Sequence, residues 1–504
     1  MWARYRVVGA GTEGKDNGSR RTTDVDMRPA KNTLFILSDE HNRNVAGCYG
    51  HPFVQTPNID ALAARGTRFT NAYCNSPICV PSRAALATGR YVHRTRCWDN
   101  ALAYHGQIPS WHHVVREAGG EAVSIGKLHF RSTDDDNGFS REILPMHIKE
   151  GKGDLKALLR ANPPPKKGTR DMAAEAGIGT SDYFAFDQRV TEAAVGWIGE
   201  AASRTPEAPW ALFVSFVMPH FPLVVPERFY ALYDHLSLDE LRAGLDAPEP
   251  GHPALAELRA GLDYDDHFND EKRAIALKAY FGMVTAVDEN IGRVLAALSD
   301  AGLADDTRII YTSDHGDNLG SRGLWGKSVH YEDSAAVPLV TVGEGFPVGV
   351  ESTPVSLVDI FPTIVESTGA GDPATVDGLD GTSLFDIVNQ PDPERAVLSE
   401  YHAVASRSGH FMLRKGRWKL MYYVGHPPQL FDLQDDPSEH HDLAADPTHA
   451  ETLASLEAEL RRIVDPEAAS EMAFRDQAAV IRAHGGEEAI LGAAEIPFTP
   501  VPTG

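Results

Sequence analysis

The chain contains the segment Cys79-Val80-Pro81-Ser82-Arg83-Ala84-Ala85-Leu86-Ala87-Thr88-Gly89-Arg90, from which the rest of the sequence is best interpreted. Pro81 suits the first turn of a helix, where its missing N–H has no partner to lose. Cys79 is therefore expected at a helix N-terminus, where the macrodipole and free backbone N–H groups favour an anion. Arg83 follows one turn later, and its guanidinium suits a tetrahedral oxyanion. The segment predicts a helix that begins at an anion site and presents a cysteine there.

Acidic residues follow two apolar segments that have the character of buried strands. Residues 33–38 lead into Asp39-Glu40-His41-Asn42, and residues 307–313 lead into Asp314-His315-Gly316-Asp317-Asn318. In open α/β sheets, ligands bind beyond the carboxyl ends of the strands, so the two acidic ends are expected to converge on one cation. Oxygen ligands suit a hard divalent ion such as calcium, magnesium or manganese.

Four further short segments carry Lys, His or Asn next to apolar runs or to the motifs above. They are Gly126-Lys127-Leu128-His129-Phe130, Met218-Pro219-His220-Phe221-Pro222, Asp99-Asn100-Ala101 and Gly323-Leu324-Trp325-Gly326-Lys327. Taken singly, each of the first three is better explained as a solvated strand end or a turn. The last is far more specific, because it follows Ser313-Asp314-His315-Gly316-Asp317. Their joint presence, in this order, favours one shared site.

Together these motifs resemble the signatures of the type I sulfatases, most closely the choline-sulfatase and phosphonate-monoester-hydrolase branch. The resemblance covers residues 31–445. It implies an α/β, alkaline-phosphatase-like fold: a mostly parallel sheet flanked by helices, then a smaller C-terminal antiparallel sheet plus helix. In this family a maturation enzyme oxidises the motif cysteine to Cα-formylglycine, whose hydrated aldehyde attacks sulfur. Elimination of sulfate then returns the aldehyde.

The resemblance also implies a role for each candidate residue. One divalent cation, with calcium expected first and manganese or magnesium as alternatives, would be held by Asp39, Glu40, Cys79, Asp314 and His315. Charge on the transferring group would be stabilised by the catalytic side chains Arg83, Lys127 and Lys327, and Asn100 would bind the substrate anion. His220, with Lys327, would protonate the leaving alkoxide. His129 would take the proton of the remaining hydroxyl.

Two of these ligand positions depart from the commonest family pattern. Relatives usually carry Asp or Gln where this chain has Glu40, whose extra methylene lets it ligate from a different angle or point elsewhere. His315 replaces the Asn of many arylsulfatases, as it does in the choline-sulfatase branch. A nitrogen ligand tilts the choice modestly toward manganese. The identity of the metal and the role of Glu40 therefore stay open.

The expected activity is hydrolysis of a small anionic sulfate monoester, and three other functions remain to be weighed. A phosphonate monoester or phosphodiester hydrolase would use the same residues on the same fold. A non-enzymatic anion-binding protein with an unmodified Cys79 would be expected to lose the Lys and His positions. An ordinary cysteine hydrolase would need only Cys and His, and would leave the acidic strand ends unexplained. The alcohol part of the substrate is not identified by the sequence.

Composition restricts the class of protein further. The 504 residues include 47 Lys and Arg against 71 Asp and Glu, a formal charge of −24. This acidity argues against nucleic acid or an anionic membrane as a partner, because both reward a basic face. Four cysteines do not make a disulfide framework. No apolar run reaches transmembrane length and no secretory signal is evident, so we expect a cytoplasmic protein.

The pattern along the chain predicts four parts. Residues 1–29 are polar and are expected to form a disordered leader, with Met27 as an alternative start to Met1. Strands alternate with helices over 30–390, the catalytic domain. Short strands and an amphipathic helix follow in 391–470, a small α+β subdomain. Residues 471–504 are predicted to be an extended tail.

Two features of this organisation bear on the site. The polar insertions 131–181 and 227–271 form either walls of the substrate pocket or exposed decoration. The apolar, proline-rich end at 496–502 is expected to lie in a groove. In the relatives this segment reaches a neighbouring subunit, which implies a homo-dimer or tetramer with the tail across the interface. A tail packed on its own subunit is the alternative.

Overall fold

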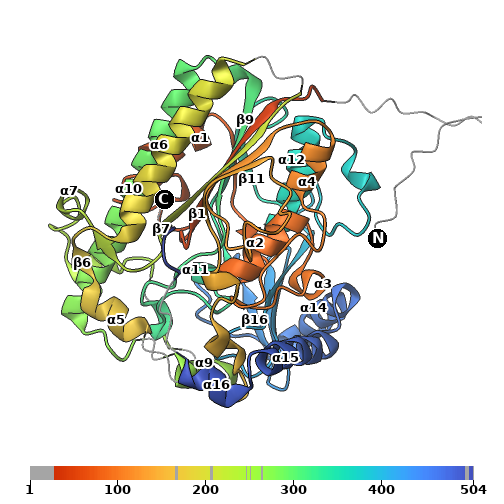
Figure 1. Ribbon diagram of the computed structural model, residues 1–504. Helices are drawn as coiled ribbons and strands as arrows, with labels where there is room; N and C mark the ends of the chain where they lie inside the picture. The colour runs from red at the N-terminus through yellow and green to blue at the C-terminus, as the bar shows by residue number, and fades with distance from the viewer. Residues whose placement is uncertain are drawn as a thin grey trace, which may run out of the picture.

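The computed structural model describes residues 28–164, 168–204, 208–245, 247–249, 251–262, 265–493 and 499–502. The predicted leader and the alternative start at Met27 therefore lie almost wholly outside the described residues. Figure 1 shows a large sheet with helices on both of its sides and a second, smaller sheet below it.

The large sheet has eight strands in the order β11-β2-β10-β9-β1-β7-β4-β5. Its strands are β1 (Asn32–Asp39), β2 (Thr67–Phe69), β4 (Ala122–Lys127), β5 (Arg141–Met146), β7 (Ala211–Pro219), β9 (Thr307–Ser313), β10 (Leu339–Val342) and β11 (Gly349–Glu351). The block from β9 to β5 is parallel, whereas β10 runs antiparallel to both of its neighbours. The predicted mostly parallel sheet is confirmed.

Alternation along β1 explains how both faces of the sheet are covered. Leu34 and Ile36 pack into one apolar core with α6 (Asp182–Ala202) and α10 (Asp270–Asp300). Phe35 and Leu37 point to the opposite face, into a second core. That core is covered by α2 (Cys79–Thr88), α4 (Trp111–Glu117) and α12 (Ile360–Thr368). A strand buried on both faces reads as a continuous apolar run, which is why β1 was recognisable in the sequence.

Shorter elements lie in the connections. The helices are α1 (Pro57–Ala64), α3 (Val92–Thr95), α5 (Gly168–Glu175), α7 (Glu227–Tyr230), α8 (Leu238–Leu241), α9 (Pro253–Gly261), α11 (Glu332–Ala335) and α13 (Leu384–Asn389). The strands β3 (Ala72–Tyr73) and β12 (Val355–Ser356) form one pair, and β6 (Gly177–Ile178) and β8 (Val224–Val225) form another. Within the described residues, no helix combines the length and apolarity that crossing a membrane requires.

The insertion at 131–181 is less irregular than expected, because it contains β5. This strand pairs in parallel with β4 at the edge of the sheet. Only Met146 of its six residues is buried. An edge strand that is mostly half-exposed lacks the apolar run by which buried strands are recognised, so the sequence pattern did not reveal it.

The C-terminal part is an antiparallel meander, as predicted, followed by three helices. The strands β13 (Ala396–Tyr401), β14 (His410–Lys415), β15 (Trp418–Tyr423) and β16 (Gln429–Asp432) pair in sequence order. The predicted amphipathic helix is α14 (Ala450–Ile463), and its Leu456 and Leu460 pack on the meander.

The predicted extended tail over 471–504 is wrong for most of its length. The chain instead forms α15 (Pro466–Ala483) and α16 (Glu487–Gly492). Asp465 caps α15 by accepting the Ala468 N–H, and Pro466 occupies the first turn. The apolar side chains that α15 buries are all small, such as Ala469 and Ala473. Its apolar stripe is therefore weak in the sequence.

The end of β7 is held in place from α6 by one buried carboxylate. Asp187 is fully buried and accepts the backbone N–H groups of Val217 (2.9 Å) and Met218 (2.8 Å). These two residues lead directly into the His220 segment. The carboxylate thus links a covering helix to a strand end that carries a candidate site residue.

We expect Asp187→Ala to destabilise the protein, because it leaves two buried N–H groups without acceptors. Each such group costs about 1–3 kcal/mol. Glu192→Ala, at an exposed position on the same helix, should change the free energy of unfolding by less than about 0.5 kcal/mol. Denaturant unfolding of the two variants measures the difference. Equal stabilities would contradict the proposed anchoring.

Candidate active site

The predicted helix start is present, and α2 begins at Cys79 itself. Ile78 precedes it in an extended conformation as the N-cap residue. The Val80 N–H, one of the N–H groups of the first turn, donates to Asn100 Oδ1 at 3.2 Å. Every residue of α2 is buried, and Cys79 is 1% exposed. The cysteine therefore lies at a helix N-terminus in the interior, with Asn100 beside it.

The two acidic strand ends converge, as the sequence predicted. β1 and β9 are parallel neighbours with Ser38 opposite Ser313, so Asp39 and Asp314 follow side by side at the carboxyl edge of the sheet. Both side chains are fully buried. Buried carboxylates are costly unless they are paired or bind a metal.

Cationic side chains neutralise one oxygen of each carboxylate. Arg83 Nη2 lies 2.9 Å from Asp39 Oδ2, and Arg83 Nε lies 2.7 Å from Asp314 Oδ2. Lys127 Nζ is 2.7 Å from Asp39 Oδ2 as well. Although burial acts to raise the pKa of Asp39, the positive charges of Lys127 and Arg83 hold that pKa well below its usual value. Asp39 is therefore ionised.

The opposite oxygens of these carboxylates face Cys79 and His315. Cys79 Sγ lies 3.2 Å from His315 Nε2 and 3.6 Å from Asp39 Oδ1. His315 Nε2 is 3.7 Å from Asp314 Oδ1. One donor atom from each of these four buried residues lies within 4.8 Å of the others. Two hard carboxylate oxygens and an imidazole nitrogen around one point fit a divalent cation.

Arg83 differs from its expected role. Its guanidinium is occupied by Asp39 and Asp314, by Ser215 Oγ (2.9 Å) and by the Lys127 carbonyl oxygen (2.7 Å). It does not line the cavity described below. Arg83 therefore holds the two carboxylates from behind rather than facing a substrate oxyanion.

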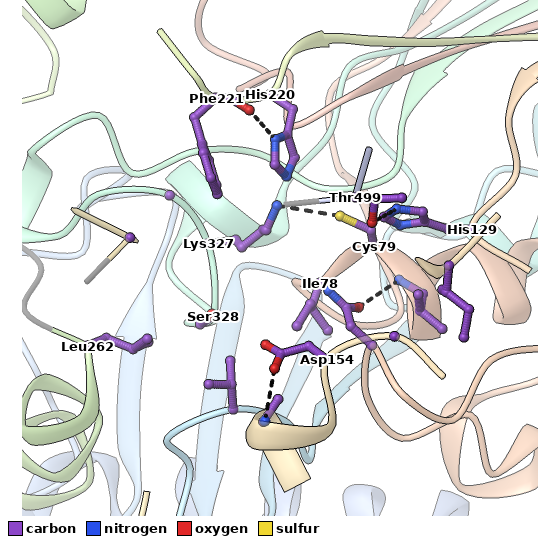
Figure 2. Close-up of a pocket in the computed structure, with 18 of the residues that line it drawn as sticks. Ile78, Cys79, His129, Asp154, His220, Phe221, Leu262, Lys327, Ser328 and Thr499 are labelled. Carbon is purple, nitrogen blue, oxygen red and sulfur yellow. Dashed lines mark hydrogen bonds between the residues drawn. The ribbon is translucent and has the colours of Figure 1, made fainter. Parts of the chain in front are cut away.

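A cavity of about 190 Å³ opens above Cys79. Predicted site residues that line it are Cys79, Asn100, Lys127, His129, His220 and Lys327. Figure 2 shows Lys327 and His220 pointing toward Cys79, with Asp154 at the other end of the pocket. Several walls come from the 131–181 insertion, including Ile148, Asp154 and Met172, and Leu262 comes from the other. These contacts support the interpretation of the insertions as pocket walls.

Burial sets the protonation of the reactive groups. Burial and the nearby Asp39 raise the pKa of the Cys79 thiol to about 12, although Lys327 Nζ lies 3.4 Å from its sulfur. A neutral thiol is a poor nucleophile, which argues against an ordinary cysteine hydrolase. Burial and Lys127 lower the pKa of His129, and burial and Lys327 lower that of His220. Both imidazoles are neutral at neutral pH.

Sequence analysis did not identify Thr499 or Tyr183 as site residues. Thr499 Oγ1 lies 3.0 Å from His129 Nε2, and the Tyr183 hydroxyl donates to the Thr499 carbonyl oxygen at 2.6 Å. Both residues line the cavity. Thr499, near the C-terminus, thus lines the active-site cavity of its own chain, whereas residues 494–498 are outside the described part. The apolar, proline-rich composition was the only signal.

Comparison with known proteins agrees with this geometry. Residues 31–370 match the family model named Sulfatase, and residues 320–465 match the model named N-sulphoglucosamine sulphohydrolase, C-terminal. The chain is 32% identical to choline-sulfatase of Rhizobium meliloti, covering 85% of each sequence. It is 31% identical to arylsulfatase K of Danio rerio, covering 88% of this chain and 86% of that protein.

Solved structures share the fold. Phosphonate monoester hydrolase of Agrobacterium radiobacter superimposes with a TM-score of 0.67 at 25% identity, covering 86% of this chain and 95% of that one. The phosphonate monoester hydrolase SpPMH of Silicibacter pomeroyi gives a TM-score of 0.66 at 24% identity, covering 86% of this chain and 94% of that one.

We expect Asp314→Ala to abolish binding of a divalent cation, because it removes one of the four clustered donors. The native protein should gain thermal stability when calcium or manganese is added, since a ligand that binds only the folded state stabilises it. The variant should lose that gain. Asp300→Ala, at the exposed end of α10, is the control. A variant that still gains as much as the native protein would contradict the assigned site.

Proposed function

The chain belongs to the sulfatase family, and we propose that it hydrolyses a sulfate monoester with a formylglycine made from Cys79 as nucleophile. The observation that carries this proposal is the position of Cys79. Its sulfur lies among the donor atoms of Asp39, Asp314 and His315 and 3.4 Å from Lys327 Nζ. A nucleophile, a cation and the negatively charged substrate would therefore meet at one point.

The residues present fit a formylglycine at position 79 and a divalent cation beside it. The hydrated aldehyde of formylglycine would supply the nucleophile, and a divalent cation held by Asp39, Asp314 and His315 would supply positive charge for the sulfate oxygens. We propose calcium first, with manganese or magnesium as alternatives, because carboxylate oxygens dominate the donor set. A formylglycine-generating enzyme is then required as a maturation partner.

Other side chains of the site stabilise charge, bind the anion and transfer protons. Lys127 and Lys327 line the cavity and provide fixed positive charge where charge develops on the transferring group. Asn100 lies beside the first turn of α2 and lines the same cavity, so it is placed to bind the anion. His129 is neutral and accepts a proton. We propose that the ammonium group of Lys327, with His220 nearby, supplies the proton that the leaving oxygen requires.

A phosphonate monoester or phosphodiester hydrolase is the second candidate, favoured by the fold shared with phosphonate monoester hydrolase at 25% identity. A binding protein without activity is disfavoured, because Lys127, His129, His220 and Lys327 are all retained around the cavity. The dimer or tetramer and the cytoplasmic location stay predictions. The alcohol part of the substrate is not assigned.

Initial rates on a sulfate ester and on a phosphonate monoester test the proposal. The enzyme should be produced together with a formylglycine-generating enzyme, and Cys79→Ser should be produced in the same way. We expect kcat/KM for the sulfate ester to exceed that for the phosphonate by at least about tenfold, or ~1.4 kcal/mol in transition-state stabilisation. Cys79→Ser should fold but lack activity.

Two outcomes would refute this assignment. A larger kcat/KM for the phosphonate would transfer the chain to the second candidate. Equal activity with and without the maturation enzyme, from protein that retains its thiol, would exclude formylglycine as the nucleophile.

A further inference from the structure

Glu40 is buried in the active site, next to the four clustered donor residues but not one of them. The side chain is fully buried, and it forms a second group of potential donors with Asp39 and His220 only. Glu40 follows β1 in a left-handed conformation, with φ at 67°. Such a conformation is uncommon outside glycine and is typical of functional sites.

The backbone of Glu40 is fixed on both sides. Its N–H donates to Asp314 Oδ1 at 3.2 Å, and its carbonyl oxygen accepts the Tyr280 hydroxyl at 2.6 Å. The direction of the side chain is therefore set by the same strand ends that form the donor cluster. The side chain carries Oε2 to Lys327 and His220, both of which line the cavity.

The carboxylate binds Lys327 and lies near His220. Oε2 lies 2.9 Å from Lys327 Nζ and 3.4 Å from His220 Nε2. Lys327 Nζ in turn lies 3.4 Å from Cys79 Sγ, and both Lys327 and His220 line the cavity. Figure 2 shows these two side chains converging from different segments. Glu40 Oε2 is the one atom that lies close to both side chains.

A bound cation does not fit well at the same oxygen. The ammonium group of Lys327 already lies at hydrogen-bonding distance from Oε2 and supplies the positive charge that a buried carboxylate needs. The other oxygen, Oε1, has no hydrogen-bond partner among the described residues. If Glu40 were a ligand of the divalent cation, Oε1 would be the atom that binds it.

We propose that Glu40 is a positioning residue for protonation of the leaving group, and not a ligand of the divalent cation. This inference rests on the proposed function of the site. Its carboxylate holds Lys327 and His220 at the wall that faces Cys79. Among the described residues, Lys327 has no other carboxylate partner within 4.0 Å.

The pKa of the leaving group distinguishes the two possible roles of Glu40. An alcohol of high pKa leaves only with a proton, whereas a phenol of low pKa leaves as the anion and needs little help. If Glu40 positions the proton donors, its replacement slows poor leaving groups far more than good ones. If Glu40 binds the cation, its replacement slows all esters and lowers the metal content.

The test uses Glu40→Gln, which keeps the shape and removes the charge, in enzyme matured at Cys79. Bound metal per chain is measured by mass spectrometry, and kcat/KM is measured over aryl sulfates of graded phenol pKa and one alkyl sulfate. We expect unchanged metal content, a loss below about threefold for the most acidic phenol, and a loss of at least about tenfold for the alkyl sulfate. Glu40→Leu, which offers no donor atom to a cation, should also keep its metal and show the same trend.

Two controls frame these measurements. Asp314→Asn should lose the metal. Glu332→Gln reports the general cost of removing a buried charge, because Glu332 pairs with Arg43 and Lys419 away from the cavity. Its effect on rate should be the same for every ester.

Loss of metal from Glu40→Gln would overturn the proposal, and so would unchanged activity or an equal loss for every leaving group. If Glu40→Gln fails to fold, Glu40→Leu provides the same readouts. A wild-type enzyme inactive on every sulfate ester would refute the proposed function instead. In that case the metal content of the variant would still decide whether Glu40 is a ligand.

Discussion

The structure depends on accommodating two carboxylates side by side in the protein interior. Asp39 and Asp314 end adjacent parallel strands, and neither has any exposed surface. Unpaired, such charges would be strongly unfavourable. Arg83 bridges them through their Oδ2 atoms, and α2 carries both this arginine and Cys79. Helix α2 therefore carries both the candidate nucleophile and the guanidinium group whose positive charge stabilises the two buried carboxylates.

This arrangement explains the division of the site into two sides. On one side, the Oδ1 atoms and His315 surround the Cys79 sulfur and are suited to a divalent cation. On the other, Glu40 gathers Lys327 and His220 along the cavity wall. The nucleophile lies between them. In the proposed mechanism, the first side stabilises charge on the transferring group and the second protonates the departing one, two tasks that hydrolysis of a stable ester requires.

Sequence analysis predicted the fold class and brought the right segments together, because buried parallel strands and acidic strand ends leave clear patterns. It could not predict features that depend on tertiary position. β5 is a half-exposed edge strand, and α15 buries small side chains, so neither has a strong apolar period. Arg83 turns to the carboxylates because they are closer and charged. Thr499 reaches His129 across 370 residues of chain, and local composition does not reveal such a contact.

The central claim is that Cys79 is the precursor of the nucleophile, since the unmodified thiol is protonated in this environment. Mass spectrometry of the proteolytic peptide containing Cys79, from protein produced with a formylglycine-generating enzyme, tests it most directly. The account predicts the mass of the aldehyde at position 79, in a fraction of molecules that rises and falls with specific activity. An intact thiol in fully active protein would contradict it.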